Sequence, residues 1–318
     1  MLNQNSDVGV AGAPAVPIKP SDRDRVVAIA MIAVSSIILS FGGLIVRNIE
    51  EADPWQINFY RASGLSVAIA VVLAVNYRGE AVDRIRRSGL AGVIAGGSLA
   101  AAGMSYIQAI THTTVANTMF TLAAIPFITA AMAWLFLQER LRLATVVSMA
   151  MAFIGIMLMV VDGFGLGATY GNLMALATAL FFSIFAIIVR KNRNIDMLPA
   201  LLISGIAIML TTLSVRYGQL SIGWHDLMLC IVWGGLMSGF ANWMFIAASR
   251  HLAAAELTLF MLLEFALAPI WVWLFLSEGP TRWSLIGGLV VITSVCGRTL
   301  LELHRDGHRL KRGRPSPG

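Results

Sequence analysis

Long apolar stretches alternate along the chain with short polar connections. A helix that crosses a bilayer needs about 20 mostly apolar residues, and its backbone must form its hydrogen bonds within the helix. The stretches that fit are Val26–Val46, Ile57–Asn76, Gly89–Ile110, Val115–Leu137, Ala144–Val161, Gly171–Val189, Leu198–Val215, Leu227–Ala248, Ala253–Leu276 and Ser284–Leu301. The pattern therefore predicts an all-α integral membrane protein with ten transmembrane helices.

The two ends of the chain differ from these stretches. Residues 1–25 are polar and contain three prolines, without the apolar core and cleavage site of a removable signal peptide. Residues 302–318 carry five Lys and Arg residues, as is typical of a solvated tail near anionic lipid headgroups. We expect a disordered tail at the N-terminus and a basic tail at the C-terminus, both cytoplasmic.

The Lys and Arg residues of the connections and tails fall mostly on one side of the predicted bundle. Connections that stay in the cytoplasm are enriched in these residues. With both termini on one side, that side holds 18 of them, and the other side holds only Arg47, Arg216 and Arg282. The bias predicts a multi-pass protein of the cell inner (cytoplasmic) membrane with both termini in the cytoplasm.

The composition agrees with a membrane protein. The chain is 58% hydrophobic and 13% charged over 318 residues, which leaves too little polar surface for a water-soluble domain. The net charge of +6 is spread over connections and tails, so nucleic acid is not an expected partner. Cys230 and Cys296 lie in apolar stretches without a disulfide or metal spacing, and we expect no metal and no cofactor.

An internal repeat relates the two halves of the chain. The segment Trp134-Leu-Phe-Leu-Gln-Glu139 recurs 139 residues later as Trp273-Leu-Phe-Leu-Ser-Glu278. The same offset aligns His112 with His251 without a gap. Because each half has an odd number of helices, the second half is expected to insert upside down. We predict two inverted five-helix repeats, residues 26–161 and 171–301, with the substrate site near mid-membrane between them.

With this repeat, the chain resembles the drug/metabolite transporter superfamily in its EamA-type ten-helix branch. The resemblance covers roughly residues 26–301 and is carried by the segment from Pro126 to Glu139, by Leu263-Glu264 with the second Trp-Leu-Phe-Leu motif, by Phe59-Tyr60-Arg61 and by Gly155. It implies transport of amino acids, other metabolites or drugs, often by proton exchange. It also implies a central cavity lined by helices one to four and six to nine.

Glu264 is the first candidate site residue. It lies about eleven residues into the ninth predicted span, close to mid-membrane. Ionisable side chains at that depth are costly and mark functional or paired positions. Glu264 is therefore expected to exchange a proton or to bind an amine of the substrate. The alternative is a permanently protonated side chain that forms hydrogen bonds between helices.

Two further ionisable residues lie near the cytoplasmic ends of the last two predicted spans. Glu256 precedes Glu264 on the same helix, and Arg298 lies late in the tenth span, which runs the other way. The two residues reach a similar depth, so a structural ion pair between them is expected. The alternatives are snorkelling of Arg298 to the membrane surface and a role in transport.

Arg61 lies near the outer end of the second span. A guanidinium group grips a carboxylate through two parallel hydrogen bonds, so Arg61 is a candidate for binding a substrate carboxylate. Snorkelling toward Glu50 or Asp53 is the alternative.

Uncharged residues complete the predicted site. Asn117, which aligns with Glu256 in the repeat, and Asn242 offer polar groups within the spans. Tyr106, Phe260 and Trp271 offer aromatic faces for a planar or cationic substrate. For both sets, hydrogen bonding or packing between helices is the alternative.

These observations predict a secondary transporter that moves a small metabolite, an amino acid or similar compound, or a drug. Alternating access with proton-coupled export is expected. The alternative is an uncoupled facilitator or a flippase for lipid-linked intermediates. Expected partners are the small-molecule substrate, protons, the lipid bilayer and a second copy of the chain in a homodimer. No HExxH or GxSxG motif occurs, and an enzyme is not expected.

Overall fold

The computed structural model describes residues 22–77, 80–112, 115–139, 143–160 and 169–276, together with 282–283, 286–287, 289–291, 293–294 and 297. The regular structure of these residues is helical throughout, as the apolar pattern predicted. In the first half the helices are α1 (Asp22–Ser40), α2 (Gly42–Arg47), α3 (Pro54–Tyr77), α4 (Ala81–His112), α5 (Val115–Leu122), α6 (Ile125–Leu137) and α7 (Leu143–Val160). In the second half they are α8 (Thr169–Lys191), α9 (Leu198–Arg216), α10 (Trp224–Ile231), the π-helix η2 (Val232–Ser238), α11 (Gly239–Ser249), α12 (Ala254–Phe260) and α13 (Leu262–Leu276).

Several of these helices are suited to crossing a membrane. Within the described residues, six helical stretches are long and apolar enough: Arg23–Arg47, Pro54–Val75, Val82–His112, Thr169–Lys191, Leu198–Arg216 and Trp224–Ser249. Two further apolar helices, Ile125–Leu137 and Leu143–Gly155, are shorter. A multi-pass membrane protein is thus confirmed. The count of ten and the inverted repeat stay predictions, and most of the tenth predicted span lies outside the described residues.

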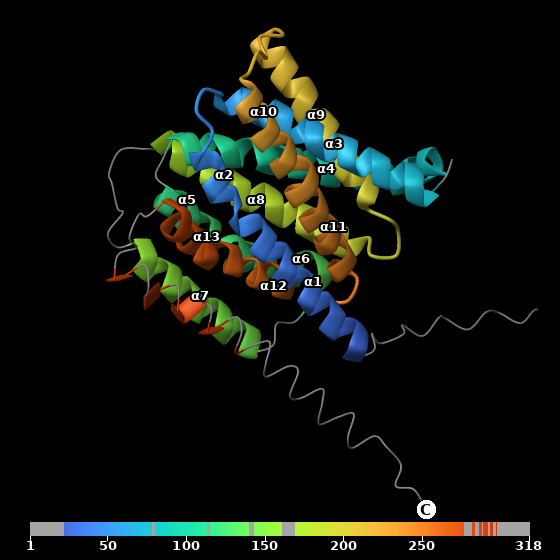
Figure 1. The fold of residues 1–318 in the computed structure, drawn as a ribbon. Helices are drawn as coiled ribbons and strands as arrows, with labels where there is room; N and C mark the ends of the chain where they lie inside the picture. The colour runs from blue at the N-terminus through green and yellow to red at the C-terminus, as the bar shows by residue number, and fades with distance from the viewer. Residues whose placement is uncertain are drawn as a thin grey trace, which may run out of the picture.

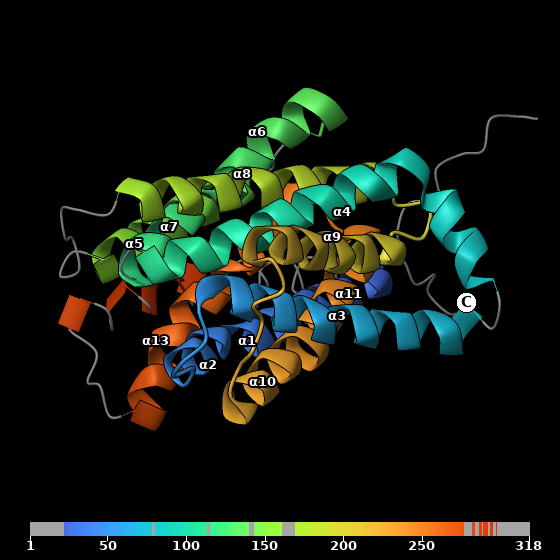
Figure 2. The same ribbon diagram turned by 90° about the horizontal axis from the view of Figure 1, so that it is seen from above.

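The helices pack in two layers (Figures 1 and 2). In the view of Figure 2, α4, α8 and α9 lie in one layer, and α1, α3 and α11 lie in the other. The closest packing within the layers joins α4 to α8 and α9, and α1 to α11. α3 packs on both α9 and η2 and so connects the two layers.

Three predicted spans are not the continuous helices that their apolar length suggests. The first span divides at Phe41, the fourth at Ala123 and Ala124, and the ninth at Met261. Pro126 accounts for the second of these breaks, because proline has no N–H to donate and fits the first turn of α6. At the ninth span, the carbonyl of Phe260 accepts a hydrogen bond from the Ser36 hydroxyl, at 3.1 Å.

The breaks in the fourth and ninth spans occupy corresponding places. α5 ends at Leu122 and α12 at Phe260, 138 residues apart, and α6 begins at Ile125 and α13 at Leu262, 137 residues apart. Both distances lie within two residues of the offset of 139 at which the sequence repeats. The agreement supports the predicted repeat without establishing that its halves are inverted.

The π-helix approaches α3 closely because glycines face each other there. A Cβ at Gly234 would lie 1.8 Å from the carbonyl oxygen of Arg61, and one at Gly64 would lie 2.6 Å from that of Ile231. Small residues allow membrane helices to pack at such short range, and π-helical turns are frequent at functional sites.

Gly234→Ala is expected to lower the free energy of unfolding by about 3 kcal/mol, because the new methyl group would collide with the backbone of α3. Thermal or denaturant unfolding of the detergent-solubilised protein measures the change. The matched control is Gly97→Ala, also in a helix, where a Cβ would meet no atom within 4 Å. Equal effects of the two substitutions would contradict the close packing of η2 on α3.

Candidate functional site

A cavity lies between the two layers at about the middle of the helices. It includes about 840 Å³ of space not occupied by protein atoms, with open solvent at its mouth counted. Its walls come from α1, α2, α3, α4, α5, α6, α8, η2, α11 and α13. Most of the wall is apolar, and the polar groups on it are few: Ser35, Arg61, Tyr106, Thr178, Ser238, Asn242 and Glu264.

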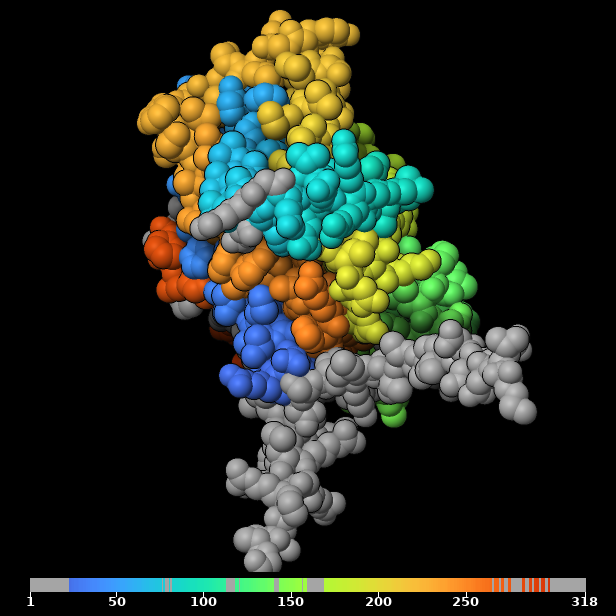
Figure 3. Space-filling view, turned by 90° about the vertical axis from the view of Figure 1, so that its right-hand side faces the viewer, coloured from blue at the N-terminus to red at the C-terminus, as the bar shows by residue number. Residues whose placement is uncertain are grey.

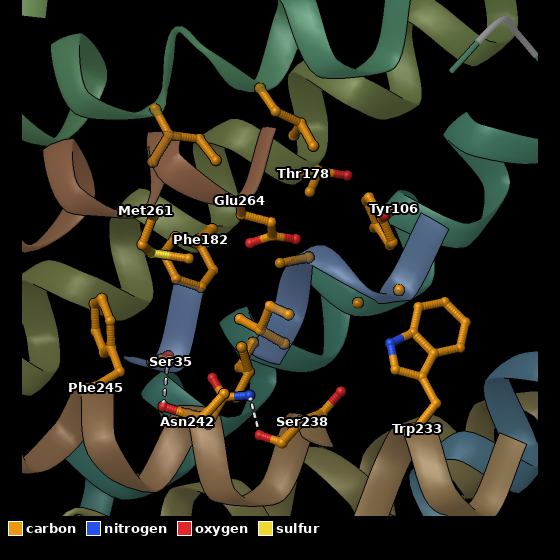
Figure 4. A pocket seen from close by; sticks show the side chains of 18 of the residues that line it. Ser35, Tyr106, Thr178, Phe182, Trp233, Ser238, Asn242, Phe245, Met261 and Glu264 are labelled. Carbon is orange, nitrogen blue, oxygen red and sulfur yellow. Dashed lines mark hydrogen bonds between the residues drawn. The ribbon is translucent and has the colours of Figure 1, made fainter. Parts of the chain in front are cut away.

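Glu264 lines this cavity from the first turn of α13, just after the break at Met261. Figure 4 shows its carboxyl group pointing into the space that Tyr106, Asn242 and Trp233 face from other helices. Among the described residues, no side chain pairs with this carboxyl group. The group is thus held in the cavity wall and remains available to a ligand.

Arg61 lines the same cavity from α3. Its guanidinium carbon lies 5.1 Å from the centre of the Trp233 ring, as in a cation–π contact. Within the described part of the chain, no carboxylate pairs with it, and Asp53 instead pairs with Arg216 at 2.8 Å. The alternative in which Arg61 snorkels toward Asp53 is therefore wrong, because Arg61 turns inward.

Two other predicted residues also reach the cavity. Tyr106 lines it from α4 and Asn242 from α11. Asn242 donates a hydrogen bond from Nδ2 to the carbonyl of Ser238 at 2.8 Å, one turn earlier (Figure 4). This bond fixes the amide and leaves its oxygen for another partner.

Phe260 and Trp271 are not part of the cavity wall. Phe260 is 1% exposed and packs in the main hydrophobic core. Trp271 stacks on Phe41 with ring centres 4.4 Å apart and donates a hydrogen bond to the Ser40 hydroxyl at 2.6 Å. Both aromatics join the ninth span to the first, and their contact with substrate stays a prediction.

Glu256 has a partner that the sequence did not indicate. Both of its carboxylate oxygens accept hydrogen bonds from Nη2 of Arg25, each at 3.0 Å. The expected pair with Arg298 is not tested, because Arg298 lies outside the described residues. The side chain of Asn117 lies outside them as well.

Some cavity residues were missed by the sequence analysis. Trp233 forms the cation–π contact with Arg61, and Phe182 and Phe245 contribute aromatic side chains to the cavity wall. Trp233 directly precedes the Gly234-Gly235 pair, and a glycine pair inside a span is a usable signal of irregular helix. For Phe182 and Phe245, nothing in the local sequence separates a cavity position from a core position.

Ion pairs join helices at the end of the bundle where α1 begins, and we call it the basic end. Figure 3 shows the start of α1, in blue, at this end. Nε of Arg190 donates to Glu139 at 2.8 Å, and Nη1 donates to the carbonyl of Ser249 at 2.8 Å. The other carboxylate oxygen of Glu139 accepts from the N–H of Ala254 at 3.3 Å. These contacts join the ends of α6, α8 and α11 to the start of α12.

Asp196, between α8 and α9, adds further contacts at the basic end. It accepts a hydrogen bond from the Tyr77 hydroxyl and lies 4.0 Å from Nη2 of Arg250. The hydrogen bond to the Asp196 carboxylate raises the pKa of Tyr77 above its usual value. The phenol therefore stays protonated and keeps donating this bond through the physiological pH range.

At the opposite end, a buried carboxylate in the first turn of α10 holds the connection between α2 and α3. Asp226 is 2% exposed and accepts hydrogen bonds from the N–H groups of Glu50, Glu51 and Ala52 at 3.1, 2.9 and 2.9 Å. These bonds and the pair between Arg216 and Asp53 hold the connection from α2 to α3 against α9 and α10.

Comparison with known proteins agrees with this architecture. Residues 26–161 match the EamA-like transporter family, as the resemblance in sequence predicted, and the match indicates a membrane transporter of small molecules. One solved crystal structure covers 87% of this chain and 98% of its own, with a TM-score of 0.73 and 16% identity. At that identity the likeness shows the fold alone. No curated protein matches the chain.

Asp226→Asn is expected to lower the free energy of unfolding by about 2 kcal/mol, because hydrogen bonds to a charged acceptor would be weakened or lost. Asp83→Asn, at an exposed position of α4, is the control and should change little. Thermal unfolding in detergent compares the two variants. If Asp226→Asn were as stable as the wild type, the carboxylate would not hold the connection between α2 and α3 to α10.

Proposed function

Since residues 26–161 match the EamA-like transporter family, we propose that the protein is a secondary transporter of a small zwitterionic metabolite, an amino acid or similar compound. It works by alternating access in the cytoplasmic membrane, with both termini in the cytoplasm. Residues 26–161 and 171–301 form its two inverted repeats. Export in exchange for protons is the proposed direction.

One observation carries this proposal. Arg61 and Glu264 line one cavity from different helices, and among the described residues neither has an oppositely charged partner. A charge in the membrane interior is costly unless it is paired. A molecule with both a carboxylate and an ammonium group would satisfy both side chains at once.

Proton coupling follows from the two partners that Glu264 would have. A carboxylate can hold the ammonium group of the substrate or a proton, and the two exclude each other. Release of the substrate would then be followed by uptake of a proton. The carboxyl group's position in the cavity wall, where both partners reach it, supports this exchange.

Alternating access is supported because the cavity lies away from the basic end, where contacts between side chains hold the helices together. The cavity walls are formed mainly by residues near the middle of the helices, whereas Arg25, Glu139 and Arg190 hold helices together at the basic end. If the basic end faces the cytoplasm, as the Lys and Arg bias predicts, these contacts must break before the substrate enters from inside.

An uncoupled facilitator or a flippase for lipid-linked intermediates is the alternative on the same fold. Both would use the cavity without proton exchange at Glu264. A pH gradient would then leave the transport rate unchanged, and this separates them from the proposed exchanger.

Glu264→Gln is expected to abolish the effect of a pH gradient on transport, because the amide neither binds a proton nor pairs with an ammonium group. Uptake of labelled amino acids into proteoliposomes, with and without an applied gradient, measures this effect. Thr178→Val, in the same cavity wall, is the control that keeps the carboxyl group. Full coupling in Glu264→Gln would remove Glu264 from the mechanism.

Glu139→Gln is expected to expose the cavity to the basic end about fivefold more often. The substitution removes a partly buried ion pair that stabilises the closed state by about 1 kcal/mol, and this loss changes the equilibrium between the closed and the open state by that factor. The reporter is Ser35→Cys in the cavity wall, in a chain whose native cysteines are replaced by serine. Labelling with a membrane-impermeant maleimide added at the basic end measures exposure.

The control for this experiment is Glu80→Gln, which removes an exposed partner of Arg84 at 3.9 Å. That substitution should leave labelling of the reporter unchanged. Equal labelling in the two variants would mean that the contacts of Glu139 do not close the basic end.

A further inference from the structure

A second, smaller pocket adjoins the cavity on the far side of Arg61. It lies between α3, α4, α9, η2 and α11, and we call it the side pocket. Its walls are Arg61, Ala62, Leu65, Leu99, Gly103, Ser204, Ile208, Gly234, Ser238 and Asn242. Arg61, Leu99, Gly103, Ser238 and Asn242 also line the main cavity, so the two spaces share one wall.

Two hydrogen-bond donors in the side pocket lack acceptors. Nε of Arg61 and the hydroxyl oxygen of Ser204 are both buried, and neither has a hydrogen-bond partner among the described residues. Ser204 is 1% exposed. Buried polar groups are normally paired, and an unpaired one costs free energy. The side pocket thus presents a cation and a hydroxyl group to whatever enters it.

The rest of the wall favours a negative ligand. None of the residues that line the side pocket is acidic. Ser238 adds a second hydroxyl group, while the Nδ2 donor of Asn242 is already bonded to the Ser238 carbonyl. The remaining wall is apolar or glycine, which excludes water and strengthens the attraction between an anion and the guanidinium group.

Two glycines fix the guanidinium group at this place. A Cβ at Gly103 would lie 3.0 Å from Nη2 of Arg61, and a Cβ at Gly234 would collide with the Arg61 carbonyl. The first glycine makes room for the charged group, and the second holds the backbone that carries it. The guanidinium group of Arg61 thus fits between the two spaces because these positions carry no side chain.

We infer that the side pocket is a binding site for a small monovalent anion, held by Arg61 and Ser204 with help from Ser238. Two sources have this chemistry: a halide ion such as chloride, and the carboxylate of the transported molecule. The inference rests on the geometry around Arg61 and holds whether or not the protein exchanges protons. In the substrate-free protein, such an anion neutralises a guanidinium group inside the membrane.

Thermal unfolding of the purified, substrate-free protein tests the inference. Sodium chloride is titrated against a bulky sulfonate buffer salt at constant ionic strength. A ligand that binds the folded state raises the unfolding temperature, so the wild type should show a saturable rise with chloride. Arg61→Gln should lose the chloride dependence.

Ser204→Ala provides the sharper test, because it removes one donor and leaves the charge in place. Its chloride dissociation constant should be about tenfold higher, as expected for loss of a hydrogen bond to an ion. The matched control is Ser214→Ala on the same helix, where the exposed hydroxyl group bonds to the Leu210 carbonyl. That variant should behave as the wild type.

Acetate distinguishes the two sources of the anion. If acetate also raises the unfolding temperature and weakens chloride binding, the carboxylate of the transported molecule takes this place. If chloride alone acts, the site is a halide site. A wild type insensitive to chloride and acetate, or a Ser204→Ala variant with unchanged affinity, would overturn the inference. Neither result would decide whether Glu264 couples transport to protons, which the pH-gradient experiment tests separately.

Discussion

A charge inside the hydrocarbon of a membrane needs an oppositely charged or strongly polar partner, because water is not there to solvate it. This constraint sorts the charged residues of the protein by depth. Toward the helix ends, Glu256 pairs with Arg25, Glu139 with Arg190, and Asp53 with Arg216. In the cavity, Arg61 and Glu264 have no such partner among the described residues. Arg61 and Glu264 thus line the cavity, where a ligand can contact them.

The cavity is lined by residues at the places where several helices are irregular. The fourth and ninth spans break at Ala123–Ala124 and Met261, the first breaks at Phe41, and the eighth changes to a π-helix at Val232. Hydrogen bonds from Ser36 and Trp271 join the first and ninth spans next to their breaks. Side chains from the broken segments then face one space instead of packing in continuous helix interfaces.

The two ends of the bundle are held by different means. At the basic end, side chains pair with side chains across several helices. At the opposite end, the pair between Asp53 and Arg216 is joined by a buried carboxylate, Asp226, that accepts from three consecutive backbone N–H groups. Ion pairs between helices can separate when the helices move apart, whereas a carboxylate that caps a connection fixes the two elements to each other. This difference supports the proposal that the cavity opens at the basic end.

The sequence by itself determined which segments are long and apolar enough to cross the bilayer, because this is a local property of the chain. It also placed Glu264 well inside the ninth apolar stretch, whereas the helix start at Ile125, next to Pro126, interrupts a stretch that the sequence predicted as one span. Only the tertiary structure decided that Arg61 turns inward and that Trp271 bonds to Ser40, 231 positions away in the chain. Local periodicity says what environment a helix face prefers. The partner across that face is set by how each helix is rotated and where it breaks, and these depend on packing between distant segments.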